Sequence, residues 1–283
     1  MSITTPKILA FTVLPTLLMF SAGCSSSGPS AAEPGTPAFF WSSARQSFQT
    51  GDYVHASESL SKLTTSQNEY RTRAQAEIVV LSTGMVKGYM DYAEAYDAGS
   101  HANRDNALAF HRQASGARSQ AKGVLLQAVE AFHELNTKVK DPNIAFEFGP
   151  PSGSLSEIGN LTRVGKGMLP PASDAEATQR KAIQNGVVWS SCRAVGAADD
   201  SAKASEILKQ VPAQIVREKF LYGMAETLYE QSDLFGPKQL DEPLRMKMIC
   251  NEALEALKQV SPSKETKELE TKIQKVMKSV RAT

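Results

Sequence analysis

Apolar residues recur every three or four positions along most of this chain, which is the spacing of one face of an α-helix. The longest such stretches are 71–97 and 106–137, and shorter ones follow after residue 175. No stretch shows a convincing strand-like alternation of apolar and polar residues. The pattern therefore predicts an all-α domain over residues 38–283.

The helical pattern is interrupted over residues 142–175, where proline and glycine are frequent. A capping box at Ser154 and Glu157 predicts one short helix inside this insertion. A second box at Ser173 and Glu176 predicts the start of the next helix. Irregular segments of this length in helical domains are usually functional or disordered, so the insertion is a candidate recognition segment.

Two aromatic residues, Phe146 and Phe148, lie where the chain leaves the second long helix and enters this insertion. In one interpretation they fill the core between helix pairs, which is the commoner role of isolated aromatic residues. In the other they belong to a partner or ligand surface. The sequence favours the first interpretation and leaves the second open.

Residues 40–63 predict two short helices joined by a tight turn. Glycine in Gly51-Asp52-Tyr53 allows a positive φ, and the small residues Ala44 and Ala56 allow two helices to approach closely. With Phe40 at the large aromatic position, these residues resemble the tetratricopeptide repeat. The resemblance implies antiparallel helix pairs stacked as a superhelix, here with one irregular insertion.

The last part of the chain resembles a second, looser unit of the same kind. A helix is expected over residues 215–234, followed by one that starts at Pro243 and ends before Pro262. Residues 264–281 are amphipathic, with lysines on the outer face, and are expected to cap the stack.

The N-terminus contains one basic residue, a short apolar run and then a cysteine. Lys7 precedes an apolar run, Ile8–Phe20, which is followed by Ser21-Ala22-Gly23 and then by Cys24. The run is too short for a membrane span, which needs about 20 residues, but it suits a secretory signal. These residues resemble the signal of a bacterial lipoprotein, which implies that residues 1–23 are a signal peptide and that Cys24 is acylated and becomes the first residue of the mature chain.

Residues 24–37 consist mainly of serine, glycine, proline and alanine, which predicts a flexible tether. By resemblance to the bacterial sorting rule, Ser25 after the cysteine implies anchoring at the periplasmic face of the outer membrane. Ser21 stands where a lipoprotein signal usually has leucine. The alternative is a buried N-terminal helix that contains an incidental cysteine.

The charge balance bears on the class of partner. Thirty-one basic and 30 acidic residues give a net charge of +1. Nucleic-acid binding depends on a basic field that displaces counterions, and this composition does not supply one. We therefore expect no nucleic-acid partner.

Besides Cys24 the chain contains Cys192 and Cys250. In the oxidising envelope these two could join helices through a disulfide. Alternatively, they are small buried residues that do not meet. The sequence does not decide between these interpretations.

We find no convincing catalytic or metal-binding pattern. The four histidines, His55, His101, His111 and His133, have no metal-type spacing. The segment Gly159–Gly167 has the wrong spacing for a phosphate-binding loop and lacks its hydroxyl residue. We therefore expect a non-catalytic protein without a cofactor.

The expected function is binding or scaffolding of another envelope protein by the helical repeats. Concave surfaces of stacked helix pairs suit peptide or helix partners. Tyr89, Tyr92 and Tyr96 are candidates for this surface, although such a tyrosine stripe is more often part of a core.

The alternative is an accessory solute-binding lipoprotein. The segment from Gly88 to Tyr96 weakly resembles the T-component lipoproteins of TRAP transporters, which implies a small-molecule ligand. A large apolar cavity would favour this alternative, whereas a solid core would count against it.

Overall fold

The computed structural model describes residues 32–279, and this part of the chain is largely helical, as predicted. The earlier helices are α1 (Pro37–Thr50), α2 (Tyr53–Thr64), α3 (Arg71–Ala102), α4 (Ala107–Lys138) and α5 (Gly159–Gly165). The later ones are α6 (Ala172–Ala194), α7 (Ser201–Leu208), α8 (Arg217–Gln231), α9 (Pro243–Leu257) and α10 (Lys264–Ser279). Residues 1–31, which include the predicted signal, Cys24 and most of the tether, lie outside the described residues.

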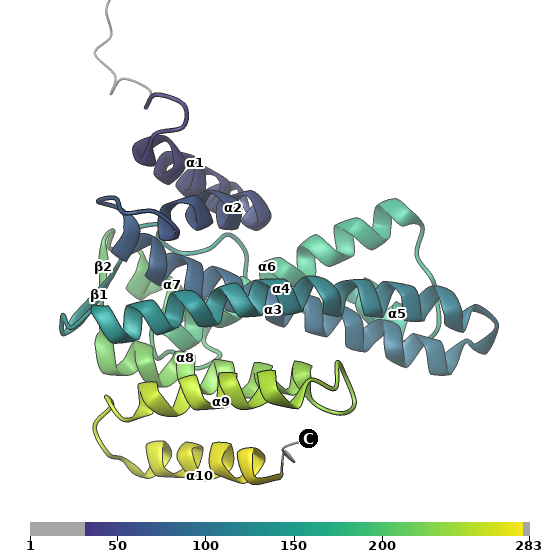
Figure 1. Cartoon of the computed structure of the whole chain (residues 1–283). Helices are drawn as coiled ribbons and strands as arrows, with labels where there is room; N and C mark the ends of the chain where they lie inside the picture. Colours follow the sequence, from purple (N-terminus) through teal and green to yellow (C-terminus); the bar gives the residue numbers. More distant parts are fainter. Residues whose placement is uncertain (1–31, 280–283) are drawn as a thin grey trace, which may run out of the picture. The chain divides into compact units, whose positions relative to one another are not determined.

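Helix α3 lies at the centre of the packing. Every residue from 74 to 86 is buried, and the helix contacts α2, α4, α5, α6 and α8 (Figure 1). A helix that is buried on all sides must be surrounded by other elements, which explains why α3 shows no clean polar face. It continues to Ala102, past the end expected at residue 97, and Gly99 allows Phe110 of α4 to approach closely in this added part.

The short helix pair predicted at residues 40–63 is present as α1 and α2. Gly51 ends α1 with a φ of 80°, and its backbone N–H donates to the carbonyl oxygens of Phe48 and Ser47. Asp52 then caps α2 by accepting a hydrogen bond from the backbone N–H of His55. The glycine turn therefore has the conformation that the sequence indicated.

Helices α3 and α6 cross in very close contact through glycines. A Cβ atom on Gly84 would lie 2.5 Å from the Cα atom of Val187, and one on Gly88 would lie 2.5 Å from that of Ile183. On α6, a Cβ atom on Gly186 would collide with the carbonyl oxygen of Gly84. Only glycine permits this approach, so the centre of the domain is solid.

The prediction of no strands was wrong. Strand β1 (Asn143–Phe146) pairs antiparallel with β2 (Ala213–Val216), with Asn143 opposite Val216 and Phe146 opposite Ala213. Each strand has four residues, too few for a recognisable alternation, and the partners are far apart in the sequence. Because β2 occupies residues 213–216, α8 begins at Arg217 rather than at residue 215.

Neither predicted capping box forms. Helix α5 begins at Gly159, and Glu157 accepts a hydrogen bond from the hydroxyl of Thr162 instead of capping its own turn. Helix α6 begins at Ala172, directly after Pro171, without a side-chain cap. The proline holds its own φ at −55°, so the helix starts earlier than the serine would have placed it.

Helices α9 and α10 begin close to their predicted positions. Asp200 caps α7 by accepting from the N–H of Lys203, and Pro243 occupies the first turn of α9. Helix α10 buries Leu269 and Ile273 and exposes its lysines. Within residues 32–279, no helix is both long and apolar enough to cross a membrane.

Candidate functional site

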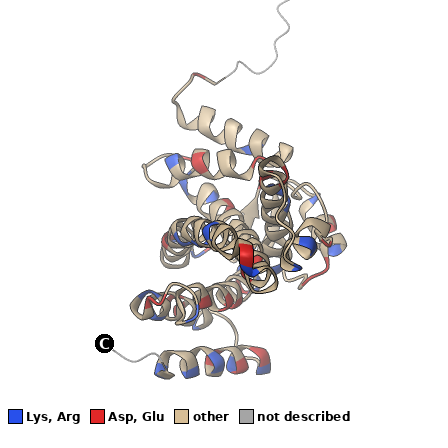
Figure 2. Ribbon diagram, turned by 90° about the vertical axis from the view of Figure 1, so that its right-hand side faces the viewer, with Lys and Arg blue, Asp and Glu red and all other residues tan. Residues whose placement is uncertain are grey.

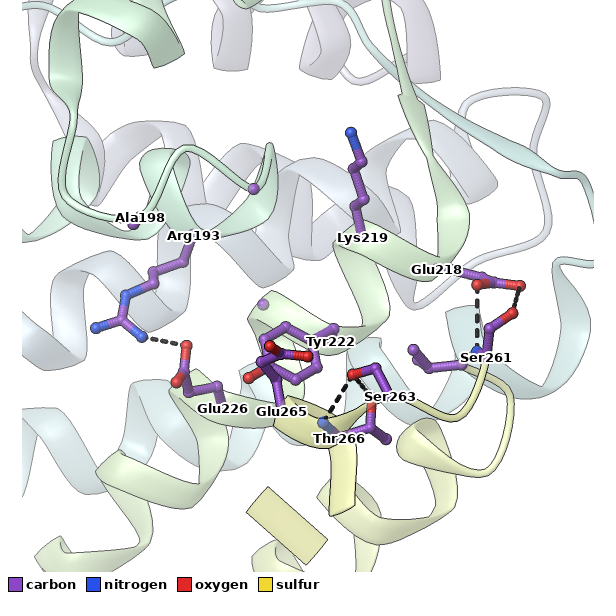
Figure 3. A pocket seen from close by; sticks show the side chains of 13 residues that line it. Arg193, Ala198, Glu218, Lys219, Tyr222, Glu226, Ser261, Ser263, Glu265 and Thr266 are labelled. Carbon is purple, nitrogen blue, oxygen red and sulfur yellow. Dashed lines mark hydrogen bonds and ion pairs between the residues drawn. The ribbon is translucent and has the colours of Figure 1, made fainter. Parts of the chain in front are cut away.

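A groove of about 630 Å3 opens between α8, the turn that follows α6, and the loop before α10 (Figure 3). One wall is the turn after α6, which includes Gly196 and Ala198. The other wall is the loop before α10, which includes Val260, Ser261 and Ser263. Its volume is within the usual range for ligand sites, and it is partly open to solvent.

Two glycines shape the α6 side of this groove. A Cβ atom on Gly223 of α8 would collide with the carbonyl oxygen of Arg193, so the glycine allows α8 to approach the end of α6. Gly196 then reverses the chain with a φ of 70°. The turn lies beside α8, where Gly196 faces the methylene groups of Lys219.

Tyr222 lies in the groove between the two walls and is half-buried (Figure 3). Burial raises the pKa of its hydroxyl, and the carboxylates of Glu226 and Glu265 raise it further. The phenol therefore stays neutral at physiological pH. It offers an apolar ring face and a hydrogen-bonding hydroxyl in a negatively charged setting.

One end of the groove is organised around Arg193. Its guanidinium pairs with Glu226, and it lies 3.7 Å from Oδ1 of Asp199 and 3.5 Å from Oε1 of Glu230. The same guanidinium lies over the ring of Trp189, 5.1 Å from its centroid. A single cation is thus shared by three carboxylates and fixed on an aromatic face.

The other end is organised by hydrogen bonds. The carboxylate of Glu218 accepts from the N–H of Ser261 at 3.2 Å and from its hydroxyl at 3.1 Å. Ser263 accepts from the N–H of Thr266 at 3.1 Å and so caps α10. These bonds hold the loop before α10 against α8. Hydrogen bonds from its own backbone and from Ser263 keep the pKa of Glu265 below its usual value.

Sequence reasoning missed this site, although the sequence contains a signal for it. Glu218, Tyr222, Glu226 and Glu230 are spaced by four residues and so share one face of α8. The neighbouring positions of α8 are mostly buried, whereas Glu218 and Glu230 are exposed and Tyr222 and Glu226 are half-buried. Stripes of charge at this spacing are common on solvated helices, and only the tertiary structure shows a groove above this one.

The groove carboxylates serve as hydrogen-bond acceptors and ion-pair partners rather than as an arranged acid–base pair. In the described part of the chain, no group of three or more His, Cys, Asp or Glu side chains could hold a metal ion. The arrangement suits binding of a ligand with positive charge and some apolar surface.

The predicted tyrosine surface requires correction. Tyr92 and Tyr96 are 2% and 1% exposed and pack in the core with Phe110. Tyr89 is 6% exposed and, with Met85, lines a shallower groove of about 350 Å3 between α2 and α4. The stripe is covered because α3 is enclosed by other helices, so these tyrosines do not form an exposed surface.

Phe146 and Phe148 are likewise buried, at 4% and 3% exposed, so they do not form a partner surface. The ring centroid of Phe148 lies 4.9 Å from that of Trp41, and the ring of Phe146 packs against Phe220. Pairing of β1 with β2 directs this segment inward. The interpretation that they fill the core is the one that agrees with the structure.

A buried carboxylate, Glu77 of α3, holds the same segment. Its Oε1 atom accepts hydrogen bonds from the backbone N–H groups of Glu147 at 2.7 Å and Phe148 at 3.2 Å. Burial raises the pKa of Glu77 to about 7, and the two hydrogen bonds only partly offset this effect. Nearer the surface, the Nη1 atom of Arg73 forms an ion pair with the Oε1 atom of Glu147 at 3.1 Å.

Cys192 and Cys250 are free and buried within the described residues, on α6 and α9 respectively, so the structure does not contain the disulfide. The thiol of Cys250 donates a hydrogen bond to the Ser232 hydroxyl. Burial raises the pKa of Cys192 to about 11, which makes it a poor nucleophile. These are small core residues.

No family model, curated protein or solved structure matches the chain at a significant level. The function must therefore be inferred from the sequence and from the geometry of the groove.

Proposed function

We propose that this chain is a non-catalytic envelope lipoprotein that binds a partner protein in the groove between α8 and α10. The observation that carries the proposal is the groove itself, an open channel with Tyr222 between walls that are held in place. A preformed groove lowers the ordering cost of binding. Because the groove is partly open to solvent, a polypeptide segment has access to it.

Anchoring through Cys24 places the domain at the periplasmic face of the outer membrane in this proposal. The support is the sequence of residues 1–37, in which a short apolar run, small residues and a cysteine precede a tether. The tether would let the groove reach a partner near the membrane surface.

We further propose that the helix pairs are of the tetratricopeptide kind, stacked as a superhelix. Support comes from α1 and α2, where Ala44 and Ala56 are fully buried beside the turn at Gly51. Two helices of 32 residues, α3 and α4, are longer than such repeats use, so the resemblance is local.

The alternative is solute binding, as in an accessory lipoprotein that resembles the TRAP T-component. It is favoured only by the groove volume, which would also admit a small molecule. Against solute binding, α3 and α6 pack directly against each other through their glycines, which leaves no space for a ligand between them at the centre of the domain. The space beside Glu77 is only about 10 Å3, too little for a solute.

The test is native mass spectrometry of the full chain captured in mild detergent from its own envelope. We expect a protein bound at fixed stoichiometry. Tyr222→Ala should weaken binding about thirtyfold, since truncating an aromatic anchor of an interface commonly costs about 2 kcal/mol. Tyr70→Ala is the matched control, because Tyr70 is also half-buried and lies outside the groove.

A protein that stays bound in both variants would show that the groove is not the binding site. A bound small molecule without a protein would instead support solute binding. Release of the partner by both variants would point to general destabilisation, which circular dichroism would reveal.

A further inference from the structure

The groove has a marked charge asymmetry. Its lining holds two basic side chains, Arg193 and Lys219, and three acidic ones, Glu218, Glu226 and Glu265. Asp199 and Glu230, which pair with Arg193, add two further carboxylates at its edge. This excess of three negative charges contrasts with the net charge of +1 of the whole chain. Figure 2 shows acidic and basic residues mixed over much of the described chain.

The negative charges are spaced along the groove rather than gathered at one point. Glu218 and Glu226 are eight residues apart on α8, which corresponds to about 12 Å along the helix axis. Glu265 faces Tyr222 from the opposite wall (Figure 3). An extended peptide rises about 3.3 Å per residue, so two side chains four positions apart span a similar length.

The middle of the groove offers apolar surface beside its charged groups. The ring of Tyr222 lies between the charged ends (Figure 3), and Val260 also lines the groove. An aliphatic residue would bury surface here, and a neighbouring ammonium or guanidinium group could lie over the tyrosine face. The guanidinium of Arg193 already makes this kind of contact with Trp189 in the same region.

We propose that the groove binds an extended segment of a partner protein that carries two basic side chains about four residues apart, with an aliphatic residue between them. The inference rests on the proposed protein-binding function and adds the chemistry of the partner. Charge complementarity selects the segment and speeds its association, and the apolar middle fixes its register.

The test uses the full chain in nonionic detergent and a fluorescent peptide with two lysines four positions apart and a leucine midway. Binding is followed by fluorescence anisotropy at low and high salt. The peptide should bind, and binding should weaken as salt screens the groove charges. A peptide with glutamates in place of both lysines should not bind.

The decisive variant is the double substitution Glu218→Gln and Glu265→Gln, which keeps side-chain size. It should weaken lysine-peptide binding about tenfold, because two negative charges near the ligand are lost. The matched control, Glu130→Gln with Glu206→Gln, removes two exposed carboxylates outside the groove and should leave binding unchanged. Circular dichroism would confirm that both variants are folded.

Three results would overturn the inference. These are failure of the lysine peptide to bind, equal loss of binding in the two double variants, and spermidine competing as well as the peptide. The last would assign the groove to free polyamines. If the peptide fails while a native partner is still released by Tyr222→Ala, the protein-binding function stands and only the basic character of the partner is wrong.

Discussion

At the scale of single residues, Glu77 is the clearest departure from what the sequence suggests. In the sequence, Glu77 is a single charged residue in a largely apolar stretch of α3. In the structure it is only 5% exposed, and its carboxylate accepts a hydrogen bond from the backbone N–H of Phe148. Buried carboxylates are costly when ionised, and hydrogen bonds compensate only in part. Protonation of the Glu77 carboxylate is therefore coupled to the hydrogen bonds that hold residues 147 and 148 against α3.

The first prediction concerns pH. The pKa of Glu77 is about 7 in the folded chain and near 4.5 when unfolded. Between these values the folded state binds more protons, so this residue makes the free energy of unfolding fall as pH rises from 4.5 to 7. The total loss is roughly 3 kcal/mol and is complete above pH 7.

Glu77→Gln should remove this pH dependence of the free energy of unfolding. The reason is that a glutamine carbonyl oxygen can accept the same two hydrogen bonds without ionising. Urea unfolding at several pH values would measure the free energy of unfolding, with Glu130→Gln as the control at an exposed position. The stability gain of Glu77→Gln over the parent should grow from pH 4.5 to 7. A gain that does not change with pH would contradict the assignment of a raised pKa.

At the scale of elements, glycine contacts set how closely the helices approach. Gly84 and Gly88 of α3 meet α6, and Gly223 of α8 meets the end of α6. In a sequence these glycines look only like weak points in a helix. Their packing role becomes visible when the partner helix is in place.

The second prediction compares two helical glycines. Gly84→Ala should destabilise the chain by about 3 kcal/mol, because the added methyl group meets the backbone of α6, which cannot yield cheaply. Gly116→Ala, on α4, should instead stabilise by about 0.5–1 kcal/mol, because its added methyl group meets open space and alanine favours helix. Urea denaturation would measure both. Equal effects would show that the α3–α6 contact is looser than described.

At the scale of the whole molecule, the described domain and the N-terminal segment have different roles in the proposal. Residues 32–279 contain the groove, and Cys24 is the proposed site of the anchor. The two are linked only by the proposal that the protein acts at a membrane surface, and each can be tested without the other.

The third prediction concerns Cys24. Cys24→Ser should abolish acylation and block removal of residues 1–23, because the modified cysteine is the first residue of a mature lipoprotein. Intact-mass measurement of protein purified from the envelope would show both effects. Cys192→Ser is the control and should change neither. An unmodified, unprocessed parent protein would refute the lipoprotein proposal.

The sequence by itself determined the helical class, because period-3.6 patterns over long stretches are insensitive to context. It also determined the turn at Gly51 and the start of α9, since Gly51 and Pro243 act through their own backbone neighbours. Caps and turns of this kind are local, so residues adjacent in sequence contain the needed information.

Only the tertiary structure decided the remaining features. The pairing of β1 with β2, the burial of Tyr92 and Phe148, and the groove around Tyr222 all depend on segments that are distant in sequence. Whether an aromatic residue is core or surface depends on what covers it, and a stripe of glutamates becomes a binding wall only when another element lies opposite. The spacing of residues along one helix does not specify such non-local contacts.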